Sequence, residues 1–264
     1  MGVTHPFLLG PWPRAFAHRG WHLDELHGME NSLSAFRRAA AEGYRYIETD
    51  AHATADGAVV LHHDPTLDRT TDGRGAIRRL PWSAVRTAKV GGVEPVCRLE
   101  DALEELPETY FNIDVKADEA VEPVLRVLAA HDAWDRVCLA SFEQRRLDAL
   151  VRSAGPGLLT SMGRRSVALL WAGSRWGGWP LRRLVTGGAA QVPPGFGPVR
   201  VVDRRFVRQA HRWGIEVHAW TVDHEPRMRA LLDLGVDGLV TDRPDVLRDV
   251  LRSRYGRTQP DLHA

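Results

Sequence analysis

Four short pieces of sequence between Ala17 and Asp64 carry side chains whose types suit proton transfer and anion binding. They read His18-Arg19-Gly20, Glu30-Asn31-Ser32, Glu48-Thr49-Asp50 and His63-Asp64. All but the second piece lie at the end of an apolar run, and on a barrel of parallel strands the residues at strand ends face one mouth. Two imidazoles, a guanidinium and a set of carboxylates at such a mouth could together cut a phosphodiester.

The carboxylates of two predicted strands point to a cation. Side chains two residues apart on a strand share a face, so Glu48 lies beside Asp50, and Asp114 lies beside Lys116. Burying two carboxylates on an inward face is costly unless a cation compensates them. Oxygen ligands without a nearby cysteine select a hard ion, so we expect Mg²⁺ or Ca²⁺, with Mn²⁺ as a further candidate. Asp114 is a natural third ligand beside Glu48 and Asp50.

The remaining polar residues have the types that phosphoryl transfer needs. His18 and His63 are candidates for general base and general acid, because an imidazole both takes and gives a proton near neutral pH. Arg19 offers a planar two-pronged donor to a phosphate, and Lys116 offers a point charge to the same group. The amide of Asn31 could also reach the mouth. Charge neutralisation, an activated nucleophile and a protonated leaving group are the parts of this chemistry.

Each of these residues also has a structural interpretation. A single histidine at a strand end is more often structural than catalytic, and Glu48 or Asp50 alone could pair with one of the many arginines. Asp64 suits the turn after His63, and Glu30 suits a loop that leads into a helix. The joint placement of the set at several strand ends is what favours a functional site.

Strand-like apolar runs and amphipathic helices alternate along the chain and must position these side chains. We count eight parallel-type strands and predict an α/β fold, a closed (β/α)₈ TIM barrel rather than an open doubly wound sheet. The expected strands are residues 14–18, 46–52, 111–116, 137–142, 158–162, 189–192, 216–222 and 238–242, and the expected helices are residues 32–42, 99–106, 119–131, 143–154, 203–213 and 227–234. Residues 65–98 contain no strong strand and are expected to be an insertion.

A hairpin is predicted directly after the second strand. Asp56-Gly57 between two apolar runs is a strong hairpin signal, and residues 58–62 would form the returning arm. With the turn centred there, the numbers of paired residues sum to about 113. Asp50 would then lie opposite His63, within a residue or so because of bulges.

Length, composition and charge limit the class of protein. The 264 residues suit one barrel domain over residues 1–264, and the net charge of +1 gives no global attraction to nucleic acid or anionic membranes. Cys97 and Cys138 are too few and too far apart for a disulfide scaffold or a zinc site. Residues 1–13 lack the pattern of a secretory signal, and no apolar run approaches the roughly 20 residues that span a bilayer. We therefore expect a cytoplasmic location without a transmembrane segment; the sequence predicts no oligomeric state.

Taken together, these motifs closely resemble the glycerophosphodiester phosphodiesterase family, from about residue 14 to residue 250. The ordered set of matching segments is specific. It consists of Ala17-His18-Arg19-Gly20, Glu30-Asn31-Ser32, Glu48-Thr49-Asp50, Asp56-Gly57 through His63-Asp64, Leu67-Asp68-Arg69-Thr70-Thr71, Asn112-Ile113-Asp114-Val115-Lys116, Ser141-Phe142, Trp220-Thr221-Val222 and Thr241-Asp242.

The resemblance implies a (β/α)₈ barrel with a small insertion, about residues 65–98, after the hairpin arm. It implies hydrolysis of glycerophosphodiesters to sn-glycerol 3-phosphate and an alcohol such as choline or ethanolamine. The nucleophile is either water or the neighbouring glycerol hydroxyl, and either histidine could act first as the base. The implied site residues are Glu48, Asp50 and Asp114 for one divalent ion, His18 and His63 for acid–base catalysis, Arg19 and Lys116 for the phosphate, and Trp220 for packing on the glycerol or on the substrate near it.

The chain departs from the family pattern in two places. The family usually has Glu at the position of Asp114, and the shorter side chain leaves room for a shifted ion or a bridging water. The loop of residues 20–30 is longer than usual and contains Trp21, His22 and His27. We expect His22 and His27 at the surface rather than among the ligands.

Two other functions fit the same residues. A lysophospholipase D would remove the headgroup of a lysophospholipid, and the segment from Trp171 to Trp179, with tryptophans among arginines, could make peripheral contact with a membrane. That segment lacks a clean amphipathic pattern, which instead favours a helix and loop that pack against the barrel or a partner subunit. The second alternative is a non-catalytic barrel that binds phosphates or lipid headgroups without turnover.

Overall fold

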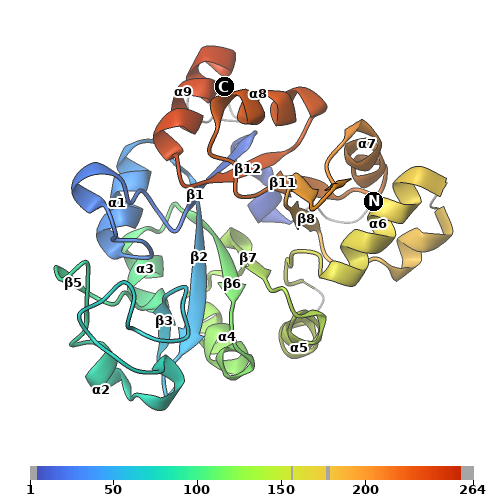
Figure 1. Cartoon of the computed structure of the whole chain (residues 1–264). Coiled ribbons are helices and arrows are strands. Elements are labelled where there is room, and N and C mark those ends of the chain that lie inside the picture. Colours follow the sequence, from blue (N-terminus) through green and yellow to red (C-terminus); the bar gives the residue numbers. More distant parts are fainter. Residues whose placement is uncertain (1–4, 156, 177–178, 257–264) are drawn as a thin grey trace.

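A ring of parallel strands forms the centre of the molecule, and helices surround it (Figure 1). The computed structural model describes residues 5–155, 157–176 and 179–256. Within these ranges, seven parallel strands follow the order β7–β6–β2–β1–β12–β11–β8. Their bounds are β1 Arg14–His18, β2 Tyr46–Ala53, β6 Tyr110–Val115, β7 Val137–Ala140, β8 Ala189–Val192, β11 Glu216–Ala219 and β12 Gly238–Thr241.

Thr160 and Ser161 take the eighth place in the ring. Thr160 pairs with Leu139 of β7, and Ser161 pairs with Ala189 of β8, both in parallel. The backbone N–H of Ser161 donates to the carbonyl of Leu139 at 2.9 Å. The predicted α/β barrel is confirmed, although the strand expected at residues 158–162 is reduced to these two single pairs.

Side chains along the strands alternate between the inside of the barrel and the core beneath the helices. On β2, Ile47 and Ala51 belong to the hydrophobic core beneath the helices, whereas Glu48 and Asp50 line a cavity inside the ring. The pairing of β2 with β6 sets Asp50 beside Asp114. The period of two residues therefore collects carboxylates from separate strands at one mouth.

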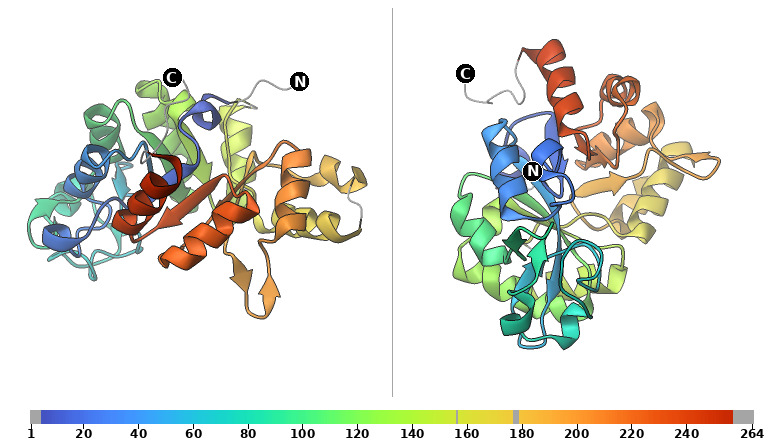
Figure 2. Two further views of the ribbon diagram at one scale, coloured as in Figure 1. Left: turned by 90° about the horizontal axis from the view of Figure 1, so that it is seen from above. Right: turned by 60° about the vertical axis from the view of Figure 1, so that its left-hand side comes forward.

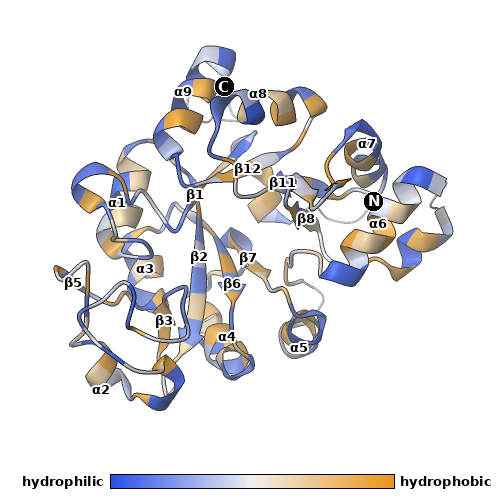
Figure 3. Cartoon of the chain, viewed as in Figure 1, coloured by the Kyte–Doolittle hydropathy of each residue, from blue (hydrophilic) through white to orange (hydrophobic). Residues whose placement is uncertain are grey.

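The surrounding helices are amphipathic, and those over Leu33–Ala41 and Arg204–Arg212 begin at residues whose side chains cap the helix. The hydroxyl of Ser32 accepts from the N–H of Ala35 at 3.1 Å, and the carboxylate of Asp203 accepts from the N–H of Phe206 at 2.8 Å. Figure 3 shows hydrophobic and hydrophilic residues along each helix. The helices are α1 Leu33–Ala41, α3 Leu99–Glu105, α4 Val121–Ala130, α5 Gln144–Ala154, α6 Arg164–Trp176, α7 Arg204–Arg212, α8 Glu225–Leu234 and α9 Pro244–Tyr255. The sequence did not predict α9, and it indicated α6 only as a helix without bounds within the tryptophan-rich segment.

The predicted hairpin forms, with a register one residue away from the expected one. The returning strand β3 Val59–Leu61 pairs antiparallel with β2, with Ala51 opposite Leu61. The N–H of His62 donates to the carbonyl of Asp50 at 2.9 Å. His62 rather than His63 is therefore opposite Asp50, and His63 lies one residue further on.

The insertion has a small hydrophobic core of its own. It contains α2 Trp82–Val85, β4 Lys89–Val90 and β5 Glu94–Pro95, and the last two pair as a hairpin. The buried apolar side chains of this core are Met29, Val60, Leu67, Ile77, Val85, Ala88, Val90 and Val96. Because Met29 comes from the loop after β1, the insertion packs against the loops that carry the site.

The tryptophan-rich segment is mostly helical. Trp171 lies in α6, and the chain continues into a 3₁₀ helix over Trp179–Leu184 and then β8. Gly177 and Gly178 lie outside the described residues. After β8 comes a short hairpin of β9 Gly195–Phe196 and β10 Val199–Arg200. Within the described part of the chain, no helix combines the length and the apolar character needed to cross a bilayer.

Candidate active site

Most of the predicted site residues line one cavity of about 860 Å³ at the carboxyl ends of the strands. His18 ends β1, and its pairing partner on β2 is Glu48. Asn31 does not line the cavity. The predicted residues that do are His18, Arg19, Glu48, Asp50, His63, Asp114, Lys116 and Trp220.

Lys116 joins two of the three predicted metal ligands. Its Nζ lies 2.7 Å from Asp50 Oδ1 and 2.7 Å from Asp114 Oδ2. Burial alone would lower the pKa of Lys116, but these two carboxylates outweigh it and raise the pKa. Among the described residues, no three His, Cys, Asp or Glu side chains are grouped as they would be around a metal ion. In this arrangement the ammonium supplies part of the positive charge that the carboxylates need.

Glu48 is the carboxylate that has an oxygen without a hydrogen bond in this arrangement. It is buried, and its Oε2 accepts no hydrogen bond. Burial and the neighbouring Asp50 raise the pKa of Glu48 to about 7. A buried carboxylate oxygen without a donor, beside a second carboxylate, is a position that a hard cation would satisfy. The oxygen chemistry of Glu48, Asp50 and Asp114 therefore suits such an ion, although in this structure the three carboxylates do not surround one point and Lys116 pairs with two of them.

His18 is held between two carboxylates. Its Nδ1 is hydrogen-bonded to Asp242 Oδ1 at 2.6 Å, and its Nε2 lies 3.6 Å from Glu48 Oε2. Burial lowers the pKa of His18, but Glu48 and Asp242 outweigh burial and raise it. Burial would raise the pKa of Asp242, but hydrogen bonds from His18 and His22 bring it well below its usual range, so the ionised carboxylate accepts the Nδ1 proton. This fixes the tautomer of His18 and leaves Nε2 as its exchanging nitrogen.

A tight turn after β1 aims Arg19 at the mouth. Arg19 has a φ of 56°, its N–H donates to the carbonyl of Glu48 at 2.8 Å, and its carbonyl accepts from the N–H of Asn31 at 2.9 Å. Gly20 follows with a φ of 88°, and a Cβ there would lie 2.9 Å from the backbone of Ala35. The turn therefore needs glycine after the arginine, which explains the local sequence.

The side chains of Arg19 and Asn31 both hold Asp50. Arg19 Nε lies 3.2 Å from Asp50 Oδ2, and Arg19 Nη1 donates to Glu30 Oε1 at 3.0 Å. Asn31 Nδ2 donates to Asp50 Oδ2 at 2.9 Å, while its Oδ1 accepts from Thr49 at 2.7 Å. Both ends of the Asn31 amide are used, so this residue positions Asp50 instead of lining the cavity.

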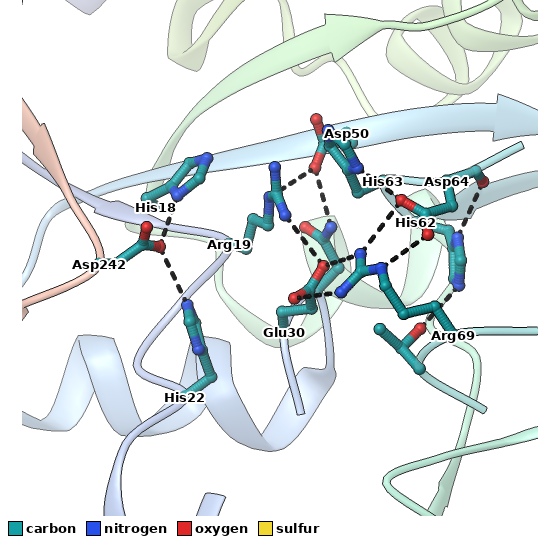
Figure 4. A network of polar contacts seen from close by, with 12 residues as sticks. His18, Arg19, His22, Glu30, Asp50, His62, His63, Asp64, Arg69 and Asp242 are labelled. Carbon is teal, nitrogen blue, oxygen red and sulfur yellow. Dashed lines mark hydrogen bonds and ion pairs between the residues drawn. The ribbon is translucent and has the colours of Figure 1, made fainter. Parts of the chain in front are cut away.

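His63 is attached to the rest of the site through a chain of ion pairs (Figure 4). Its Nδ1 is hydrogen-bonded to Asp64 Oδ1 at 2.7 Å. Arg69 of the insertion pairs with Asp64 at 2.6 Å and with Glu30 at 2.6 Å, and Glu30 pairs with Arg19. The hydrogen bond from Arg69 is the main cause that lowers the pKa of Asp64 far below its usual range. Figure 4 shows His18 and His63 on either side of Arg19 and Asp50.

An aromatic pair forms part of the rim. The rings of Trp220 and Phe142 meet edge to face with centroids 5.6 Å apart, and Lys116 Nζ lies 5.9 Å from the Phe142 centroid. Below them, Gln191 Nε2 donates to Asn112 Oδ1 at 2.7 Å across the barrel. The polar site thus has an aromatic boundary on one side.

The sequence assigned no catalytic role to four residues that hold the two histidines, either by direct contact or through an aspartate. Asp242 directly follows an apolar run, and that position at a strand end was a usable signal. His22, expected at the surface, lies 3.3 Å from Asp242. Arg69 came from the insertion, where no periodic pattern indicates contact with the site. Asp64 was expected to orient a turn, but its side chain pairs with His63 and Arg69.

Comparison with known proteins gives consistent matches. The model of the glycerophosphoryl diester phosphodiesterase family matches residues 18–246. A Mycobacterium tuberculosis protein named "Probable glycerophosphodiester phosphodiesterase 2" is 41% identical over 245 residues, which cover 91% of each chain.

Solved structures share the fold at lower identity. An Oleispira antarctica phosphodiesterase, in complex with the product sn-glycerol-3-phosphate, is 22% identical with a TM-score of 0.75, and the match covers 91% of this chain and 97% of that one. A glycerophosphodiester phosphodiesterase from Agrobacterium tumefaciens is 23% identical with a TM-score of 0.71, over 88% and 97% of the two chains.

Proposed function

The chain belongs to the glycerophosphoryl diester phosphodiesterase family, and from this premise we propose that it hydrolyses glycerophosphodiesters to sn-glycerol 3-phosphate and an alcohol. His18 and His63 would be the acid–base pair. The Oleispira phosphodiesterase was solved with its product sn-glycerol-3-phosphate, which supports sn-glycerol 3-phosphate as a product of this protein.

One observation carries this proposal: two histidines line the same cavity, and each is paired with an aspartate. His18 is hydrogen-bonded to Asp242 at 2.6 Å, and His63 is hydrogen-bonded to Asp64 at 2.7 Å. Each carboxylate accepts the Nδ1 proton, so each Nε2 is the nitrogen that exchanges a proton with the substrate. Two such groups on either side of an arginine suit a reaction that needs one base and one acid.

One histidine removes a proton from the nucleophile, which is water or the neighbouring hydroxyl of the glycerol, and the other gives a proton to the oxygen of the departing alcohol. When water attacks, these two proton transfers give glycerol 3-phosphate directly. When the glycerol hydroxyl attacks, they give a cyclic phosphate, which a second pair of transfers opens: water loses a proton as it attacks phosphorus, and the released glycerol oxygen takes one up. Arg19 and Lys116 bind the phosphate oxygens and stabilise the charge that develops on them.

A divalent cation, Mg²⁺ or Ca²⁺ with Mn²⁺ as a further candidate, would be held by Glu48, Asp50 and Asp114. The unpartnered Oε2 of Glu48 and its raised pKa support this choice. When bound, the ion supplies charge neutralisation and polarises the phosphoryl group. Lys116 would then share Asp50 and Asp114 with the ion. Its ammonium group would be neutralised less by these carboxylates and would attract a phosphate oxygen more strongly.

The test is release of glycerol 3-phosphate from a panel of glycerophosphodiesters after EDTA treatment, with Mg²⁺, Ca²⁺ or Mn²⁺ restored separately. We expect activity to disappear with EDTA and to return with at least one ion. Tight binding of the diester without turnover under every ion would instead indicate the non-catalytic barrel. A cytoplasmic location stays a prediction.

A further inference from the structure

The cavity that holds the two histidines continues past them along a second, apolar surface. This apolar wall is formed by α6, by the β9–β10 hairpin and by Val201, which directly follows β10. Its side chains are Val167, Ala168, Trp171, Phe196, Val199 and Val201. Because the same cavity contains both surfaces, a ligand on the wall and a phosphodiester at the histidines can be parts of one molecule.

We propose that the apolar wall binds a single hydrocarbon chain carried by the diester that is cleaved. The inference rests on the proposed function, and it extends the substrate class from water-soluble glycerophosphodiesters to single-chain lipids. The chain could be attached to the glycerol, as in a lysophospholipid, or to the departing alcohol.

The chemistry of the wall favours hydrocarbon over polar groups. Only Trp171 among its side chains has a hydrogen-bonding atom, and its Nε1 already donates to the carbonyl of Arg200 at 3.3 Å. Arg164, which begins α6, lines the same cavity 5.7 Å from the Phe142 centroid and gives the wall a polar end; water on the six wall side chains beyond it finds no free side-chain partner. Displacing such water by an apolar group is favourable, and apolar lining with a few polar groups at one end is typical of a site for an amphipathic ligand.

The wall is held in place from behind. The guanidinium of Arg175 lies 3.9 Å from the ring centroid of Trp171 and covers one face of the indole. Arg175 is fixed in turn by Asp203 Oδ2 at 2.8 Å, and the same Asp203 caps α7. A preformed surface costs little ordering when a ligand binds.

The hairpin of the wall exposes apolar side chains that no core explains. Phe196 is 78% exposed and Val199 is 44% exposed. Figure 2 shows the hairpin, in orange, projecting beyond the helices around the barrel. Exposed apolar groups at the rim of a reaction cavity indicate a contact with ligand.

An aromatic bridge connects the wall to the phosphate-binding residues. Phe142 and Trp220 line the same cavity, and Phe142 lies within 5.9 Å of Lys116. Phe142 is 47% exposed. The Phe142 ring therefore lies within 5.9 Å of Lys116 on one side and within 5.7 Å of Arg164 on α6, where the wall begins, on the other.

The first experiment measures kcat/KM for glycerophosphocholine and for lysophosphatidylcholines of increasing acyl length. All are kept below the critical micelle concentration, so that no membrane surface is involved. We expect kcat/KM to rise roughly two- to fourfold per added methylene until the wall is covered. A matched series with the alkyl chain on the departing alcohol shows on which side of the phosphate the wall lies. Flat profiles in both series would overturn the inference.

The second experiment uses a matched pair of variants. Val199→Ser, alone and with Phe196→Ser, changes the wall at exposed positions where folding is not at risk. Val93→Ser makes the same change in the β4–β5 hairpin, where Val93 is 67% exposed and does not line the cavity. We expect the ratio of kcat/KM for the longest chain to that for glycerophosphocholine to fall about tenfold in the double variant. The ratio should stay constant in Val93→Ser, and an equal ratio in both variants would contradict the inference.

Failure of the proposed function gives a different result. If the wild-type protein cleaves no diester with any ion, the wall is tested by titration calorimetry with the longest-chain lysophosphatidylcholine. Binding that weakens in the double variant but not in Val93→Ser supports the wall as a chain site. Absence of binding to the wild-type protein would refute it.

Discussion

Buried charge lies at both ends of the barrel, and the two ends satisfy it differently. At the base, Arg14 begins β1 and donates two hydrogen bonds to Glu216, at 2.8 and 2.6 Å. Its other donors reach the carbonyls of Leu8, Gly10 and Pro11. At the mouth, by contrast, Glu48 Oε2 lacks a hydrogen bond although it is buried.

The carboxylate of Glu216 at the base is therefore hydrogen-bonded within the protein. Glu48 Oε2 at the mouth is left for a cation or a ligand to satisfy. Hydrogen bonds from His218 and Arg14 hold the pKa of Glu216 below its usual value despite burial, while burial and Asp50 raise the pKa of Glu48. In a barrel of this type the base serves stability and the mouth serves chemistry. Of these two buried carboxylates, the fully hydrogen-bonded one supports the scaffold, and the one with an unused oxygen lies in the reaction cavity.

The largest effect on stability is expected from breaking the base. Arg14→Met removes two hydrogen bonds from Glu216, which keeps its contact with His218, and takes one donor from each of three carbonyls. Removal of one partner from a buried ion pair costs about 3–5 kcal/mol. Urea denaturation should show this loss, while kcat of the folded fraction stays close to wild type. A loss below about 1 kcal/mol would remove the distinction between the two ends.

The corresponding change at the mouth should affect activity strongly and stability little. Glu48→Gln removes a buried charge without a hydrogen-bond partner, so the unfolding free energy in EDTA should be unchanged or higher by about 1 kcal/mol. Activity with the restored ion should fall by about 100-fold, because a ligand is lost. Strong destabilisation of Glu48→Gln in EDTA would show that Glu48 is satisfied within the protein.

A smaller loss of activity is expected when the partner of His18 changes. Asp242→Asn keeps the size of the side chain but removes the charge that fixes the tautomer and raises the pKa of His18. We expect kcat to fall by about 10- to 100-fold with little change in urea midpoint. The control is Asp245→Asn, which is close in sequence and pairs with Arg243 instead; it should leave kcat unchanged.

The smallest effect is a pH dependence at the base. His211 Nε2 lies 2.8 Å from Asp237 Oδ2, and this hydrogen bond raises the pKa of His211. The protonated form is favoured in the folded state, so its stabilisation is present below the unfolded pKa near 6.5 and is lost as pH rises through the higher folded pKa. Because His211 is 42% exposed, we expect less than about 1 kcal/mol between acidic and alkaline pH. His211→Gln should remove this slope in denaturation curves, and an unchanged slope would exclude His211 as its cause.

The sequence predicted the mouth better than its supporting contacts. Strand alternation is local, so the shared faces of Glu48 with Asp50 and of Asp114 with Lys116 follow from spacing of two residues. The contacts of Arg69 with Asp64 and Glu30 depend on how the insertion folds back, and no short-range pattern encodes this. The register of the β2–β3 hairpin differs by one residue from the predicted register, because the exact geometry of the turn sets the pairing of the two strands.

The sequence was least informative where local signals were weak. The strand at 158–162 is reduced to single pairs, and the bounds of α6 were not predicted, although a helix and loop were favoured for the segment from Trp171 to Trp179. Thr49 and Asp50 occupy the amide of Asn31 in this structure, and a role of Asn31 in substrate binding stays a prediction. Tertiary contacts that bind both ends of a polar side chain are invisible in a sequence pattern.

The central claim is that two histidine–aspartate pairs at one mouth perform the acid–base chemistry. Its most direct test is the rate of glycerol 3-phosphate release by His18→Ala and by His63→Ala, each with the ion restored and each checked by urea denaturation. The account predicts a loss of about 10²–10⁴-fold in kcat for each variant with a nearly unchanged urea midpoint. Turnover within a few-fold of wild type in both folded variants would contradict it.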